Sequence, residues 1–193
     1  MINKDKDVIK QLLREKTDHS INSLAKKLKM DYKNAHNVVK RLEKQGIITL
    51  QPFGKSLKII LKKECSSLVY AAEHERAQEL LKNKDLALLL DYYKRNMKSR
   101  FYILLIFGSY AKGTGAKGSD IDVMFIIPDA SAEQQEREIQ RIAAMLPLDI
   151  HLNVFSESEF LAMKDSKKDT VGSEAMKNNI IAHGIEEYYG LLQ

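Results

Sequence analysis

The sequence predicts an α+β protein in which a basic, mostly helical amino-terminal part precedes a small mixed sheet flanked by helices. Two observations predict this class. In the amino-terminal third, apolar residues recur at helical spacing and are followed by two short β-type runs. Further along, buried-type strands alternate with helical segments. We therefore expect residues 1–65 to form one domain, residues 66–98 a helical connector and residues 99–193 a second domain.

Composition excludes several classes of protein. The chain has 193 residues, of which 44% are hydrophobic and 30% charged, as in ordinary soluble globular proteins. Its apolar runs are too short for a membrane span, and its amino terminus lacks the apolar core of a signal peptide. Cys65 is the only cysteine, which excludes an internal disulfide and argues against a cysteine-based zinc site. We expect a cytoplasmic protein.

Charge is unevenly divided along the chain. Residues 1–65 contain 16 Lys or Arg against 7 Asp or Glu, and the remaining residues contain 15 against 19. A basic module joined to a mildly acidic one favours a polyanion as the partner of the first. A lysine-rich surface that faces only solvent is the alternative.

Three helices are expected in the first domain. Ser20 and Asp31 are typical N-cap residues and predict where the second and third helices begin. Gly46 is expected to end the third helix in a left-handed conformation. Apolar residues at helical spacing mark the first helix and the buried stripe of the third: Val8, Ile9, Leu12, Leu13, Ala35, Val38, Val39 and Leu42. The opposite side of the third helix carries Lys33, Asn34, Asn37, Lys40, Arg41 and Lys44.

Two β-type runs follow, at residues 47–50 and 57–61, with a turn between them. The expected order of three helices and a hairpin resembles a winged helix-turn-helix. So does the sequence of the segment SLAKKLKMDYKNAHNVVKRLEKQGII. The resemblance implies that double-stranded DNA is a partner, with the third helix in the major groove and the hairpin tip as the wing. It also implies a homodimer, although winged helices serve as protein-docking modules too. The DNA-binding residues would be Lys33, Asn34, Asn37, Lys40, Arg41 and Lys55.

Residues 66–98 predict helix. They are rich in Ala, Leu, Glu and Lys and contain no Gly or Pro. We expect one or two helices, with a break near residues 83–85.

The most informative motif lies between two apolar runs, at residues 101–107 and 123–127. Each run predicts a buried strand. The first ends at Gly108-Ser109, where we expect a tight turn, and the second begins after Asp120-Ile121-Asp122. Because side chains on a strand alternate, both aspartates should lie on one face, where like charges favour a divalent cation such as Mg²⁺. A surface hairpin with two solvated aspartates is the alternative.

This pattern resembles the nucleotidyltransferase superfamily that includes DNA polymerase beta, and the chain length suggests its minimal members. GSYAKGT at residues 108–114 resembles the usual GSYARGT, and SDIDV at residues 119–123 resembles SDIDL. The resemblance covers residues 100–193 and implies a nucleotidyltransferase fold that uses two Mg²⁺ ions. It implies that the catalytic and metal-binding residues are Asp120, Asp122 and Asp149. The nucleotide-binding residues would be Gly108, Ser109, Lys112 and Lys117.

The third carboxylate is expected on the alternating strand at residues 148–155. Its polar face carries Asp149, His151 and Asn153, and pairing beside the first carboxylates would bring Asp149 to them. The opposite, apolar face is formed by Leu148, Ile150, Leu152 and Val154. The alternative is an aspartate that faces water, and His151 is best interpreted as an exposed strand histidine. Capping-box patterns at residues 131–134 and 156–159 predict helices, which we expect to continue to the end of the chain. His183 is interpreted as a packing or surface residue.

These features predict a Mg²⁺-dependent nucleotidyltransferase that moves a nucleoside monophosphate from a nucleoside triphosphate to a hydroxyl of a macromolecule. The resemblance implies a HEPN-type protein as a candidate partner, as in toxin–antitoxin pairs. The competing hypothesis is a DNA-binding transcriptional regulator whose second domain only senses nucleotide or is inactive. The three aspartates argue against an inactive domain, though not against a sensor.

Overall fold

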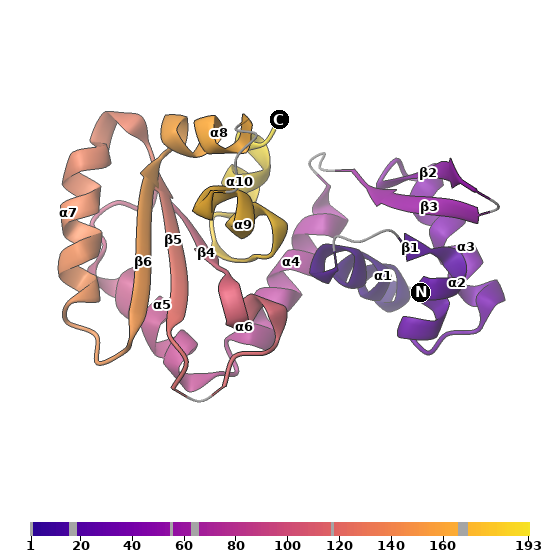
Figure 1. Cartoon of the computed structure of the whole chain (residues 1–193), viewed down its shortest axis with the longest axis horizontal. Helices are drawn as coiled ribbons and strands as arrows, with labels where there is room; N and C mark the ends of the chain where they lie inside the picture. Colours follow the sequence, from indigo (N-terminus) through magenta and orange to yellow (C-terminus); the bar gives the residue numbers. More distant parts are fainter. Residues whose placement is uncertain (1, 16–18, 55, 63–65, 117, 166–169) are drawn as a thin grey trace. The chain divides into compact units, whose positions relative to one another are not determined.

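The computed structural model describes residues 2–15, 19–54, 56–62, 66–116, 118–165 and 170–193 (Figure 1). The expected roles of Lys55, Cys65 and Lys117 therefore fall outside the described residues. The chain divides into two compact units, residues 1–73 and 74–192. Of the helices described, none has the length and apolar character that crossing a membrane requires.

The first unit contains three helices and a small antiparallel sheet of order β1-β3-β2. Its elements are α1 (Ile2–Arg14), β1 (His19–Ser20), α2 (Ile21–Lys27), α3 (Tyr32–Lys44), β2 (Ile48–Phe53) and β3 (Ser56–Leu61). The expected caps are present: Ser20 accepts a hydrogen bond from the amide of Ser23, and Asp31 accepts one from the amide of Asn34. The apolar residues expected on α1 and α3 are all buried.

The second unit is a four-stranded mixed sheet with helices around it. Helix α4 (Ser67–Leu80) runs from the first unit into the second. The other elements are α5 (Lys84–Asn96), β4 (Ile103–Ile106), α6 (Gly108–Lys112), β5 (Ile121–Ile127), η1 (Asp129–Ser131), α7 (Ala132–Ala143), β6 (Ile150–Ser156), α8 (Glu157–Asp165), α9 (Val171–Lys177), β7 (Ile180–His183) and α10 (Ile185–Leu191). The expected break between two helices is confirmed, with Asn83 as the N-cap of α5.

The strand order of this sheet is β6-β5-β4-β7. Strands β5 and β6 are parallel, whereas β4 is antiparallel to both β5 and β7. The carboxyl end of β4 therefore meets the amino ends of β5 and β6 at one edge of the sheet. The turn after β4 and the residues that open β5 lie at this edge.

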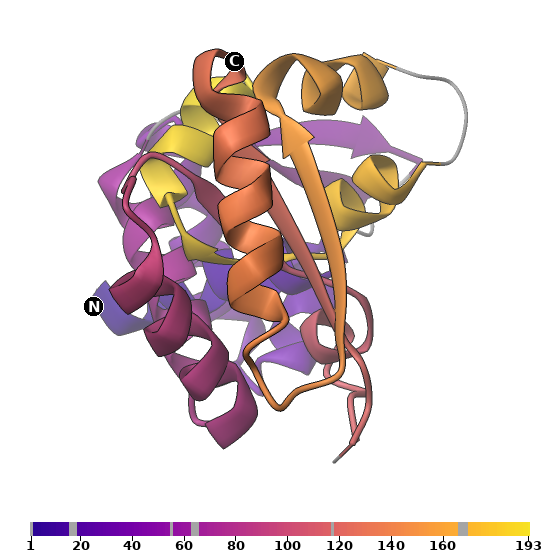
Figure 2. The same cartoon turned by 90° about the vertical axis from the view of Figure 1, so that its left-hand side faces the viewer.

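Helices α5 and α7 contact each other and cover one face of the sheet (Figure 2). Alternate residues of β5, from Ile121 to Ile127, belong to this core, and Phe125 lies against Tyr93 and Tyr102 at ring distances of 4.7 and 5.6 Å. Burial raises the pKa of Tyr93 and of Tyr102 above the usual value for tyrosine. Because side chains alternate, Asp122 belongs to the opposite face from Val123.

Two expectations about the second unit were wrong. The turn after β4 is not an isolated Gly-Ser turn, because Gly108 also begins the five-residue helix α6. The chain does not remain helical to its end either, because Ile180–His183 pair with β4 as strand β7. A four-residue apolar run is too short for a helical and a strand period to be distinguished.

The two capping boxes had different outcomes. At the start of α8 the box is confirmed: the amide of Ser156 donates to Oε2 of Glu159 at 2.8 Å, and the amide of Glu159 donates to Oγ of Ser156 at 3.4 Å. At α7 it was wrong, because the Ser131 side chain caps no backbone amide. The short helix η1 precedes α7 directly, and Oγ of Ser131 accepts a hydrogen bond from the side-chain amide of Gln135 at 2.6 Å instead.

Truncating the centre of this core should destabilise the second unit. Phe125 is 0% exposed, so we expect Phe125→Ala to lower the free energy of unfolding by about 3–5 kcal/mol. Phe101 is 75% exposed and provides the control, since its truncation should change the free energy by less than about 0.5 kcal/mol. Urea unfolding followed by circular dichroism measures both, and equal effects would show that Phe125 does not centre the core.

Candidate functional site

The motif aspartates lie where β5 begins. Asp122 is the second residue of β5, and Asp120 is the residue immediately before the strand. The side chain of Asp122 is 25% exposed, whereas Asp120 is exposed. Strand alternation directs Asp122 away from the core under α5 and α7, and extended to the residue before the strand it directs Asp120 to the same side. Further along this face of β5, Met124 and Ile126 are buried, so the carboxylates lie at its exposed end.

The carboxylate of Asp122 lies directly against the backbone of Gly108. A Cβ added at Gly108 would stand 2.7 Å from Cγ of Asp122 and closer still to Oδ2. Gly108 also has a φ of +61°, a left-handed conformation that glycine adopts without strain. The backbone of Phe107 completes the junction by donating to the carbonyl oxygen of Asp122 at 3.1 Å. Only glycine allows the turn and the carboxylate to approach this closely.

Strand β6 brings two further side chains to the same edge. His151 is the register partner of Asp122, and its Nδ1 lies 3.1 Å from Oδ1 of Asp122. The carbonyl oxygen of Asp149 accepts a hydrogen bond from the amide of Ile121 at 2.9 Å, so its backbone adjoins the start of β5. The sheet thus places Asp149 next to the motif, although His151 and not Asp149 contacts Asp122.

The donor atoms at this edge are carboxylate oxygens and one imidazole. In the described part of the chain, no group of three or more His, Cys, Asp or Glu is arranged to hold one metal ion. Two carboxylates on one face are nevertheless a suitable donor set for Mg²⁺, which commonly takes one or two carboxylates and completes its shell with water and phosphate oxygens. The residues fit Mg²⁺ as ligands of a substrate-bound ion.

The loop that follows α6 is fixed by Ser109 and Tyr110. The carbonyl oxygen of Ser109 accepts hydrogen bonds from the amides of Thr114 and Gly115, both at 3.0 Å. The hydroxyl of Tyr110 lies 3.4 Å from the carbonyl oxygens of Ala116 and Ser119. These bonds hold residues 114–116 and Ser119 against α6.

Lys112, which was expected to bind nucleotide, is paired with a carboxylate. Its Nζ lies 3.0 Å from Oε1 of Glu174 on α9, and both side chains are about half exposed. Such an exposed pair contributes at most about 1 kcal/mol and does not remove Lys112 from reach of a phosphate.

The outer face of α3 carries most of the residues expected to bind DNA. Lys33, Asn34, Asn37 and Lys40 are exposed. Asn34 supports the start of the helix: its backbone amide donates to Asp31 at 2.9 Å and lowers the pKa of that carboxyl. Lys40 lies 2.8 Å from a carboxylate oxygen of Glu43.

Arg41, by contrast, forms an ion pair with another residue of the first unit. Its Nε donates to Oδ2 of Asp5 at 2.9 Å, and a second guanidinium nitrogen contacts Oδ1. Only 8% of the Asp5 side chain is exposed, and this bond raises the pKa of Arg41 above its usual value. The pair ties α1 to α3, so Arg41 is less available to a ligand than its neighbours are.

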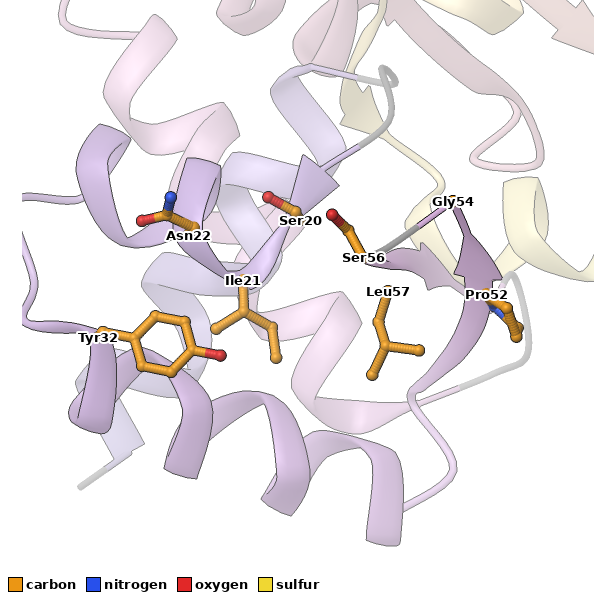
Figure 3. Close-up of a pocket in the computed structure, with 8 residues that line it drawn as sticks. All are labelled: Ser20, Ile21, Asn22, Tyr32, Pro52, Gly54, Ser56 and Leu57. Carbon is orange, nitrogen blue, oxygen red and sulfur yellow. The ribbon is translucent and has the colours of Figure 1, made fainter.

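A groove of about 490 Å³ lies in the first unit between the starts of α2 and α3 and the hairpin. The side chains of Ile21, Tyr32 and Leu57 point toward the same space (Figure 3). Its lining combines apolar side chains with hydroxyl and amide groups, and is formed by Ser20, Ile21, Asn22, Tyr32, Pro52, Gly54, Ser56 and Leu57.

Comparisons with known proteins find a family model that matches part of the second unit. Residues 90–175 match the model described as nucleotidyltransferase domain. This range contains Gly108, Asp120, Asp122 and Asp149, so the edge described above lies inside the matched residues. Residues 4–64 match a second family model, described as HVO_A0114.

Two other comparisons add little. A search of the curated proteins gives no match. Among solved structures, one described as "Crystal structure of the toxin-antitoxin with AMP-PNP" is 18% identical and covers 56% of this chain and 79% of its own, with a TM-score of 0.35. A similarity at this level supports no conclusion about fold or function.

Sequence reasoning missed two contacts in the second unit. It placed His151 on the correct face but did not pair it with Asp122, because the parallel register cannot be derived from one strand alone. It gave no signal for Glu174, which reaches Lys112 from 62 residues further along the chain.

Adding a methyl group at Gly108 should disturb this edge of the sheet. We expect Gly108→Ala to lower the free energy of unfolding by about 1–3 kcal/mol from backbone strain, and by more because the Asp122 carboxylate must move. Gly113 is the matched control, since it has a φ of +73° and nothing within 4 Å of an added Cβ. Thermal unfolding of the Gly108→Ala and Gly113→Ala variants measures the two losses of stability. Equal losses would mean that the Asp122 carboxylate moves away at no cost in free energy.

Proposed function

We propose that this protein is a Mg²⁺-dependent nucleotidyltransferase that moves a nucleoside monophosphate from a nucleoside triphosphate to a hydroxyl of a macromolecule. The match of residues 90–175 to the nucleotidyltransferase domain carries this proposal. The close contact between Asp122 and Gly108 supports it, because it places a carboxylate directly against the backbone at the start of α6.

Asp120 and Asp122 would hold two Mg²⁺ ions, with Asp149 as a further ligand on the acceptor side. When bound, these ions neutralise phosphate charge and lower the pKa of the acceptor hydroxyl. Gly108 lets the backbone approach the triphosphate, and Ser109 offers its amide and hydroxyl. Lys112 and Lys117 supply positive charge to the phosphates.

In the transfer step, the acceptor oxygen forms a bond to the α-phosphorus. The bond from this phosphorus to the bridging oxygen breaks, and pyrophosphate leaves. The proton of the acceptor hydroxyl passes to a carboxylate, for which Asp149 is our candidate because it lies at the exposed edge of the site.

The acceptor that best suits this site is large. Asp120 and Asp149 are exposed and the His151 side chain is 66% exposed, so the edge is open to a macromolecule. A HEPN-type protein is the partner that the sequence resemblance suggests. Incubation with each labelled nucleoside triphosphate, Mg²⁺ and cell extract identifies the acceptor as a labelled protein or nucleic acid.

Removing both motif carboxylates should abolish binding of metal and nucleotide together. Loss of a residue that merely supports a metal ligand typically costs about 10–100-fold in affinity, so we expect Asp120→Asn with Asp122→Asn to weaken Mg·ATP binding by at least about 100-fold. Isothermal titration calorimetry measures this.

The control for that experiment is Asp91→Asn on α5, which removes an exposed carboxylate paired with Arg95 at 2.9 Å. It should bind Mg·ATP as the wild type does. Unchanged affinity in the double variant would exclude the carboxylates from the site and favour the competing hypothesis of a regulator with a nucleotide-sensing or inactive domain.

For the first unit we propose binding to double-stranded DNA by a winged helix, in a homodimer that reads two half-sites. Its excess of basic residues, its three helices followed by a hairpin, and the exposed Lys33, Asn37 and Lys40 on α3 support this proposal. The groove of Figure 3 lies between the start of α3 and the hairpin, the two elements that would contact DNA.

The alternative for this unit is protein docking. Apolar side chains are exposed beside the groove, with Tyr32 at 56% and Phe53 at 63%. Such a surface suits a protein partner as well as it suits DNA.

Loss of two lysines from α3 should weaken DNA binding at all sequences. The logarithm of the binding constant falls linearly with the logarithm of the salt concentration, and each lost phosphate contact makes this slope about one unit shallower. Lys33→Ala with Lys40→Ala should therefore make it about two units shallower. Asn37→Ala should instead change the preference among sequences. Gel shifts over a salt series measure both effects.

Lys84→Ala provides the control, because this exposed lysine lies on α5 in the other unit. If wild-type protein binds no genomic fragment at about 50 mM salt, where electrostatic binding is strong, the first unit is a docking module.

A further inference from the structure

The Asp122 carboxylate has a different neighbour at each oxygen. Oδ2 is the atom nearest to the position that a Cβ of Gly108 would occupy. Oδ1 lies 3.1 Å from Nδ1 of His151, across the parallel pairing of β5 and β6. The carboxylate is therefore held at both ends, by a turn on one side and an imidazole on the other.

The direction of this hydrogen bond follows from the chemistry of the two groups. An ionised carboxylate only accepts, so Nδ1 of His151 is the donor and carries the proton. The imidazole is 66% exposed and the carboxylate 25%, which places the ring on the solvent side of the carboxylate. Nε2 takes no part in the bond.

Within the residues that the structure describes, the Asp122 carboxylate has its side-chain hydrogen bond with His151. Asn153, two residues further along β6, directs its side-chain amide at the carbonyl oxygen of Val123 instead, 3.5 Å away. The contact with His151 can therefore fix the rotation of the Asp122 carboxylate.

We propose that His151 is a positioning residue that holds Oδ2 of Asp122 at the Gly108 turn, in the orientation that binds the divalent cation. The terminal torsion of an aspartate is broad, and a hydrogen bond to one oxygen narrows it. Partners that orient a ligand in this way usually contribute about 10–100-fold to metal affinity. The inference rests on the proposed function, because it assumes that Asp122 is a ligand.

Three substitutions of His151 separate the hydrogen bond from the bulk of the side chain. His151→Asn places an amide N–H near the position of Nδ1, His151→Gln places one near that of Nε2, and His151→Ala removes both. Because the residue is mostly exposed, thermal unfolding of all three variants should resemble that of the wild type.

The first measurement is calorimetry of Mn²⁺ binding to the full chain in the presence of a non-hydrolysable nucleoside triphosphate analogue, because the residues fit a substrate-bound ion. We expect the Ala and Gln variants to bind Mn²⁺ about 10–100-fold more weakly than wild type, and the Asn variant to stay close to wild type. Equal affinity in the wild type and the Ala variant would overturn the inference while the proposed function stands.

The second measurement is ¹⁵N NMR of the neutral His151 ring, which distinguishes protonation at Nδ1 from protonation at Nε2. We expect Nδ1 to be protonated in the wild type and this preference to be lost in Asp122→Ala. A wild-type ring protonated at Nε2 would overturn the inference. If the wild-type protein binds no Mn²⁺, both the inference and the proposed function are overturned, even where the His151 ring is protonated at Nδ1 as expected.

Discussion

The close approach of the Asp122 carboxylate to the bare Cα of Gly108 is the constraint on which the site depends. It requires a glycine at a left-handed position directly after a buried strand, and a second strand running back alongside the first. The bond from the Phe107 amide to the Asp122 carbonyl oxygen continues the pairing of β4 and β5 up to the turn. Backbone pairing thus brings Asp122 to the turn.

The sheet behind this contact is buried on both faces, and Asp122 lies at the end of one of them. One face of β5 is buried under α5 and α7 with Phe125 among aromatic rings, and on the other face Met124 and Ile126 are buried beyond Asp122. Because β6 runs parallel to β5, its amino end arrives at the same edge and brings Asp149 and His151 with it. A tightly packed core therefore supports an open and strongly polar edge.

Much of this arrangement could be predicted from the sequence. Alternation correctly placed Leu148, Ile150, Leu152 and Val154 against the core, and the N-caps at Ser20 and Asp31 are confirmed. These signals are local: each depends on a few neighbouring residues. Strand β7 was missed because its four residues are defined by pairing with β4 and by no period of their own.

Contacts between distant residues could not be predicted from the sequence. The bond from His151 to Asp122 follows from strand register, and the pairing of Arg41 with Asp5 follows from how α1 packs on α3. Arg41 shows the difficulty well. Its position on the polar side of α3 suggested a DNA contact, yet a buried carboxylate on another helix binds it.

The pairing of Lys112 with Glu174 links the short helix α6 to α9. If Lys112 binds phosphate as proposed, the phosphate would have to compete with this carboxylate for the same ammonium group. Since an exposed pair is weak, the exchange would cost little free energy. Phosphate binding at Lys112 would then release the contact between α6 and α9.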